Sequence, residues 1–64
     1  MGAIRDTVEG KTQQATWEEF KRVRDELQEA QEDGFVQWPM SKKDAFEEMK
    51  KDGDGWVLEY RFKV

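Results

Sequence analysis

The acidic segment at residues 52–55, Asp-Gly-Asp-Gly, has its carboxylates spaced as they are in a calcium-binding loop. Aligning Gly55 with the obligatory glycine of such a loop places Lys50 at the first ligand position and Arg61 at the twelfth. Both positions need an oxygen ligand, which a cationic side chain does not supply. We therefore predict that the segment binds no metal and forms a turn between a helix and the strand that follows.

Catalysis lacks its usual participants in this chain. There is no His and no Cys, so the commonest general base, the commonest metal ligand and any thiolate metal site or disulfide are missing. The carboxylates of Glu18, Asp25, Glu29 and Glu32 fall on the polar side of a predicted helix, whereas acid–base catalysis needs a desolvated carboxylate. Ser41 has no residue placed to activate it. We expect no enzyme activity, no catalytic residue and no cofactor.

Four cations form a second set of candidate site residues. Lys42 and Lys43 fall at the start of a predicted helix, where backbone N–H groups favour a phosphate. Arg61 and Lys63 alternate along a predicted strand, and together the four are candidate nucleic-acid contacts. The net charge of −4 opposes broad attraction to nucleic acid or to an anionic membrane. The alternative is an ordinary helix surface of mixed charge.

The aromatic content is high for a core of this size. Four Phe, three Trp and one Tyr occur in 64 residues, and most of these rings must be buried because nothing else stabilises so short a chain. Phe35 and Trp38 cannot both point inward from a regular strand, since their odd separation places them on opposite faces. One of them, with Trp38 the better candidate, is therefore expected to be exposed beside Pro39. The alternative is a bulge that turns both rings inward. Because Trp is enriched at binding hot spots, Phe35, Trp38 and Pro39 are candidate partner contacts.

A capping box and an apolar stripe predict the first helix. The Thr16 hydroxyl is placed to accept the backbone N–H of Glu19, whose carboxylate reaches back. Gly34 suits the position after the last helical turn, so the predicted helix spans residues 17–32. The apolar residues at helical spacing are Trp17, Phe20, Val23, Leu27 and Ala30.

A second capping signal at Ser41 predicts a shorter helix that runs to about Lys51. Residues 35–38, Phe-Val-Gln-Trp, are aromatic and β-branched and predict a strand that Pro39 ends. Residues 56–64 alternate with period two and predict a strand that is buried on one face and wet on the other. The buried side is expected to comprise Trp56, Leu58, Tyr60 and Phe62, and the exposed side Glu59, Arg61 and Lys63.

These elements predict an α+β fold: a small single domain with two amphipathic helices on one face of a two- to three-stranded sheet, in the order (β)αβαβ. Residues 16–64 form the α+β domain, and residues 1–15 form either a weakly structured N-terminal segment or an edge strand. The strands at 35–38 and 56–64 flank a helix, which favours a parallel crossover. An antiparallel arrangement with the N-terminal segment is the alternative.

The sequence favours a small non-enzymatic protein that binds another protein through a sheet edge or an exposed aromatic surface. A homodimer is one version, because an unpaired edge strand suits pairing with a second copy. A nucleic-acid-binding module that uses Lys42, Lys43, Arg61 and Lys63 is the alternative.

No apolar run reaches the ~20 residues of a membrane span. The N-terminus also lacks the apolar core of a signal peptide, so a cytoplasmic protein without membrane contact is expected. The regular capping signals also fit a designed domain without biological function. The irregular, Gln-containing N-terminal part is more typical of a natural protein of viral or microbial origin.

Overall fold

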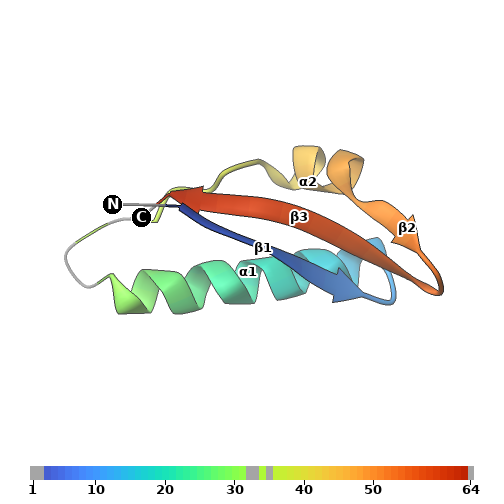
Figure 1. The fold of residues 1–64 in the computed structure, drawn as a ribbon, viewed down its shortest axis with the longest axis horizontal. Helices are drawn as coiled ribbons and strands as arrows, with labels where there is room; N and C mark the ends of the chain where they lie inside the picture. Colours follow the sequence, from blue (N-terminus) through green and yellow to red (C-terminus); the bar gives the residue numbers. More distant parts are fainter. Residues whose placement is uncertain (1–2, 32–33, 35, 64) are drawn as a thin grey trace.

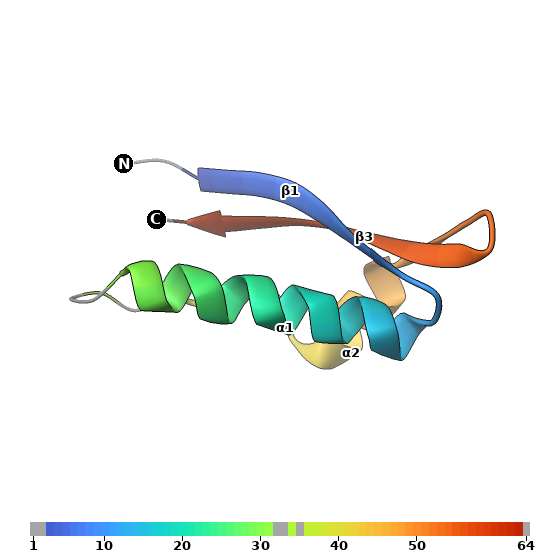
Figure 2. The same ribbon diagram turned by 90° about the horizontal axis from the view of Figure 1, so that it is seen from below.

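The computed structural model describes residues 3–31, 34 and 36–63. The elements among them (Figure 1) are β1 (Ala3–Gly10), α1 (Gln13–Ala30), α2 (Lys42–Glu48), β2 (Lys50–Asp52) and β3 (Gly55–Lys63). The strands form one antiparallel sheet in the order β1-β3-β2. Both helices lie on the same side of the sheet (Figure 2). The structure confirms the predicted α+β fold with two helices on one face of a sheet.

The second strand along the chain lies at a different place from the one that the sequence predicts. Residues 36–38 are not a strand, and Phe35 lies outside the described residues. The chain instead leaves α2 at Met49, whose backbone is extended (φ −61°, ψ 138°), and enters β2 at Lys50, where a helix was expected to continue. β3 pairs antiparallel with β1 and with β2, so the parallel crossover is wrong and the antiparallel arrangement is the one found.

Residues 52–55 form the turn of the β2–β3 hairpin, in which Asp52 is paired with Gly55. Gly53, the first central residue, has a φ of +60°, and no other residue described has a positive φ. This is the pattern of a type II′ turn, which fits the twist of a hairpin and favours Gly at that position. The turn was predicted, but as a link from a helix, because β2 consists of three exposed polar residues without alternation.

The alternation of β3 is confirmed. Leu58, Tyr60 and Phe62 are buried against the helices, whereas Glu59 and Arg61 are exposed on the far face. Trp56 is only half-buried, since it lies at the hairpin end of the strand, and its ring carries the Lys51 ammonium 5.4 Å from its centroid. The side chain of Lys63 and residue Val64 lie outside the described part of the chain.

α1 begins at Gln13, earlier than expected. Its N-cap is Thr12, whose hydroxyl accepts the backbone N–H of Ala15 at 3.0 Å. Thr16 lies within the helix and is fully buried. Its hydroxyl donates to the carbonyl oxygens of Thr12, at 2.9 Å, and of Trp56, at 3.3 Å. The predicted capping box is wrong because the Thr16 hydroxyl joins the helix to β3 instead of capping it.

Two glycines allow β1, β3 and α1 to approach each other closely. A Cβ atom on Gly10 would lie 2.5 Å from the backbone nitrogen of Thr16, and one on Gly55 would lie 2.7 Å from the carbonyl oxygen of Gly10. Neither position accommodates a side chain. The start of the helix is therefore placed directly against the end of the sheet.

Phe20 lies at the centre of the core. Its ring is fully buried and contacts Tyr60 and Phe62 of β3, with ring centroids 5.2 and 5.4 Å away. It also contacts Trp17 of α1 at 5.4 Å and Trp38 of the α1–α2 connection at 5.6 Å. The other buried apolar residues of this cluster are Val8, Val36, Ala45, Met49 and Leu58.

Replacing Phe20 with Ala should remove most of the stability of the domain. Truncation of a buried Phe costs about 3–5 kcal/mol, and a domain this small has a total stability on the order of 5 kcal/mol. Leu27→Ala, at a half-buried position of the same helix, is the matched control and should cost less. Urea denaturation measures both. Equal losses would show that Phe20 is not the centre of the core.

Tyr60 is the single tyrosine of the chain, so the absorbance of its phenolate reports one group. Burial of the ring, with a smaller contribution from the Asp6 carboxylate, raises the pKa of Tyr60 above its ordinary value. The stability that this shift contributes is complete below the pKa of the unfolded state and is lost as the pH rises through the folded-state pKa. We expect the native protein to titrate at a higher pH than the urea-unfolded protein. Identical midpoints would contradict the burial of this ring.

Candidate functional site

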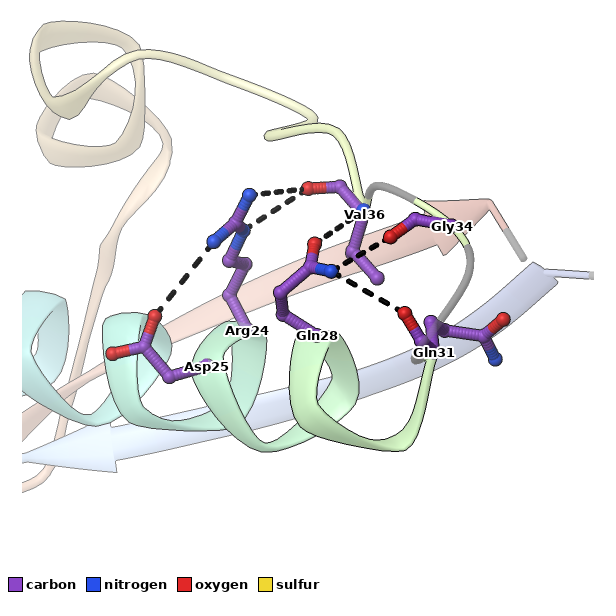
Figure 3. A network of polar contacts seen from close by, with 6 residues as sticks. All are labelled: Arg24, Asp25, Gln28, Gln31, Gly34 and Val36. Carbon is purple, nitrogen blue, oxygen red and sulfur yellow. Dashed lines mark hydrogen bonds and ion pairs between the residues drawn. The ribbon is translucent and has the colours of Figure 1, made fainter.

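The α1–α2 connection is attached to the helix by side chains. α1 ends at Ala30, and Glu32, its expected last residue, lies outside the described residues. The amide of Gln28 makes three hydrogen bonds to the connection (Figure 3), the longest of them from Nε2 to the carbonyl oxygen of Gln31 at 3.5 Å. Its Nε2 donates to the carbonyl oxygen of Gly34 at 2.8 Å, and its Oε1 accepts the backbone N–H of Val36 at 2.7 Å. The Gln28 side chain thus pairs a backbone carbonyl and a backbone N–H of the connection, as a neighbouring strand would.

Arg24 binds the other polar group of Val36. Its Nε and Nη2 both donate to the Val36 carbonyl oxygen, at 3.0 and 2.7 Å, and its Nη1 lies 3.8 Å from Asp25 Oδ1 (Figure 3). The N–H and the C=O of Val36 are therefore both satisfied by α1, while its side chain is buried in the core. This is the physical reason that the expected strand is absent, because the backbone of Val36 is already paired.

The connection places Trp38 over the core with part of its ring in solvent. Trp38 is stacked on Trp17, with ring centroids 5.7 Å apart, and also contacts Phe20. The Arg24 guanidinium carbon lies 5.0 Å from the centroid of the Trp38 ring, a cation–π contact. Even so, 37% of Trp38 is exposed, and it is the one exposed large hydrophobic residue among those described. The expectation that Trp38 is partly exposed is confirmed, and three neighbours hold its ring in place.

Three adjoining hollows surround Trp38 and continue along α2. The first, of about 370 Å³, is lined by Gln37, Trp38, Pro39 and Arg61. The second, of about 420 Å³, is lined by Trp17, Trp38, Met40, Ser41 and Lys42. The third, of about 490 Å³, shares Lys42 with the second and is lined by Gln13, Lys42, Lys43, Phe46 and Glu47. We call these three hollows together the Trp38 surface.

The start of α2 forms the far end of the Trp38 surface. As expected, Ser41 is the N-cap of this helix, and its hydroxyl accepts the backbone N–H of Asp44 at 3.2 Å. Gln13 of α1 donates from its Nε2 to the carbonyl oxygen of Phe46 at 3.0 Å, which holds the two helices together. The Lys42 ammonium lies 5.6 Å from the centroid of the half-buried Phe46 ring. A positive charge and an aromatic ring are thus presented side by side.

The cations of the Trp38 surface have no acidic partner among the residues that the structure describes. None of the ion pairs between described residues includes Lys42, Lys43 or Arg61. On α1, by contrast, the Lys21 ammonium lies 3.0 Å from the Glu18 carboxylate and is the main cause that lowers the pKa of Glu18. Lys42 contributes only a weaker attraction to that carboxylate. The positive charge at the Trp38 surface is therefore left available.

The structure brings the two candidate sets of the sequence together. Trp38 and Pro39, the expected protein contacts, share a hollow with Arg61. Trp38 shares the next hollow with Lys42, and Lys43 lies in the third. Among the described side chains, those expected to bind protein and those expected to bind nucleic acid therefore form one continuous surface.

Two expected site residues fall outside the described side chains, and the sequence did not identify two apolar residues that line the Trp38 surface. Phe35 and the side chain of Lys63 lie outside the described part of the chain. Met40 and Phe46 line the Trp38 surface. The spacing of Phe46 with Ala45 and Met49 predicts a core residue of the second helix, and Met40 belongs to no predicted element. An apolar residue directly after Pro39 and outside any periodic stripe was the available signal for Met40.

The outer edge of β1 is the other candidate binding feature. β1 lies at the edge of the sheet, with β3 as its one neighbour. The backbone N–H of Thr7 donates to Oδ1 of Asp6 at 2.8 Å, so a donor of this strand is engaged by its own neighbour. A charged side chain placed in this way discourages pairing with another strand. The Trp38 surface is therefore the stronger candidate for a binding site.

The rest of the described chain offers little other chemistry. No group of three or more acidic residues among those described is arranged to hold a metal ion. Neither helix in the described part has the length and apolar character that crossing a membrane requires. Comparison with protein-family models, with curated proteins and with solved structures finds no match to the chain.

Gln28→Ala should loosen the α1–α2 connection. The variant leaves the backbone N–H of the buried Val36 without its acceptor, which costs about 1–3 kcal/mol. Glu29→Ala, on the exposed side of the same helix turn, is the control and should change the free energy of unfolding by less than about 0.5 kcal/mol. Urea denaturation and hydrogen exchange of the Val36 amide measure the effect. An unchanged exchange rate at Val36 in the Gln28 variant would contradict the role of this amide.

Proposed function

We propose that this protein is a small non-enzymatic protein-binding domain and that the Trp38 surface is its contact site. The observation that carries the proposal is the state of Trp38, which is 37% exposed yet stacked on Trp17 and braced by Arg24. A ring that is fixed before binding loses little conformational freedom when a partner covers it. Large rigid aromatic side chains of this kind contribute the largest share of the binding energy at many interfaces.

The shape of the surface supports the same proposal. Trp38 stands between two hollows, and Met40 and Phe46 extend the apolar lining away from it. Polar and charged side chains lie at both ends, with Arg61 at one and Lys43 at the other. An apolar centre with a polar rim is the usual arrangement of a protein–protein contact.

Nucleic-acid binding is the second candidate function. It is favoured by one observation, namely that Lys42, Lys43 and Arg61 lie around an exposed aromatic ring. Cationic grooves with aromatic stacking platforms bind single-stranded nucleic acid. The net charge of −4 and the presence of Glu47 in the same surface make it the weaker candidate.

Selection of random displayed peptides on the folded protein tests the proposal. We expect the protein to enrich peptides that bind Trp38→Ala at least about thirtyfold more weakly, since a hot-spot Trp contributes about 2 kcal/mol or more. Leu27→Ala, which lines none of the three hollows, is the control for lost core packing and should keep the binding. Circular dichroism establishes that both variants are folded at the assay temperature. The proposal is wrong if no peptide is enriched, or if the enriched peptides bind Trp38→Ala as tightly as the parent.

A further inference from the structure

We infer that the segment bound by the Trp38 surface is an acidic peptide that carries an apolar anchor side chain. This inference rests on the proposed function and names the chemistry of its partner. It follows from the charge that the surface leaves unpaired and from where that charge lies relative to Trp38.

The distribution of ion pairs separates the Trp38 surface from α1. On α1, Lys21, Arg22 and Arg24 each have a carboxylate within 4.0 Å. Lys42 and Arg61 have no carboxylate within that distance among the described residues. Other described lysines, such as Lys50, are equally without a carboxylate partner, but Lys42 and Arg61 are the unpaired cations that share a hollow with Trp38. Their unpaired state fits carboxylates supplied by a partner.

The positions of these cations define how such a partner would lie. Arg61 lines one of the two hollows that include Trp38, and Lys42 lines the other. The contact with the Phe46 ring holds the Lys42 ammonium within the third hollow. An apolar side chain set against Trp38 would therefore have a cation in each of the two hollows that this ring lines. Acidic residues that flank an apolar anchor in a peptide match this arrangement.

The geometry favours a peptide over a nucleic acid. Stacking of a base needs a ring face, and Trp17 and the Arg24 guanidinium already compete for the faces of Trp38. A sugar–phosphate backbone carries a charge at every nucleotide, so a strand that follows α2 would bring phosphates near Glu47. A peptide carries its carboxylates only at chosen positions and avoids that repulsion.

The composition of the peptides selected on the parent protein is the first test. We expect acidic residues on one or both sides of an apolar residue to be enriched over the starting library. A synthetic peptide of the enriched sequence should bind more weakly once its Asp and Glu are replaced by Asn and Gln, and its affinity should fall as salt is added. Enriched peptides that are neutral or basic would overturn the inference. The loss of binding in Trp38→Ala would still support the proposed function.

Charge reversal with a matched control is the second test. The double variant Lys42→Glu/Arg61→Glu should bind the acidic peptide about tenfold more weakly, since each reversed pair contributes roughly the energy of an exposed ion pair. Lys11→Glu/Lys50→Glu carries the same net charge, and its two cations line other hollows. It should bind within about twofold of the parent, since distant exposed charges are screened. Equal losses in the two double variants would overturn the inference.

A single-stranded DNA oligonucleotide completes the test. We expect it not to displace the acidic peptide. Displacement that depends on Lys42 and Arg61, with the oligonucleotide bound more tightly than the peptide, would overturn the inference and assign the Trp38 surface to nucleic acid. Thermal melts of both double variants should match that of the parent, because all four substituted side chains are exposed.

Discussion

The packing of Phe20 between the sheet and two indole rings joins every layer of this domain. Tyr60 and Phe62 reach it from β3, Trp17 from its own helix and Trp38 from the connection that follows. A chain of this length buries only about 60% of its unfolded surface, and its sheet has one apolar face. Large rings compensate for the small number of core positions, because each buries more area than an aliphatic side chain. Because the core has so few apolar residues, none is left to cover the outermost ring, that of Trp38.

The position of that outermost ring depends on polar contacts of α1. Gln28 and Arg24 satisfy the backbone of Val36, so the connection needs no strand partner and follows the helix instead of the sheet. The buried Val36 side chain anchors the segment in the core. Trp38 then packs on Phe20 with one side and is exposed to solvent on the other. The Arg24 guanidinium serves both the backbone of the connection and the Trp38 ring, and it thereby couples the fold to the exposed surface.

The sequence predicts those parts of the structure that depend on local patterns. The alternation of β3 and the Ser41 cap belong to this class, since each is decided within a few residues. The capping box at Thr16 failed because a hydroxyl with the right spacing was instead buried against β3. The strand at residues 35–38 failed because long-range hydrogen bonds overrode a β-like composition. The partial exposure of Trp38 was expected from its odd separation from Phe35 in a regular strand. That strand is absent, so the exposure has another cause: the connection places the ring over Phe20 at the outside of the core.

The surface around Trp38 is thus a consequence of how the core is closed. α2 spans only Lys42–Glu48 and covers little of the sheet, so Phe46 is left half-buried and Trp38 covers Phe20 from outside. Under the proposed function, Trp38 contributes to folding through its inner side and to binding through its outer one. A partner that covers the outer side removes the remaining apolar area from water and stabilises the folded state by mass action. A domain of this size has a small total stability, so under the proposed function folding and recognition depend on the same ring.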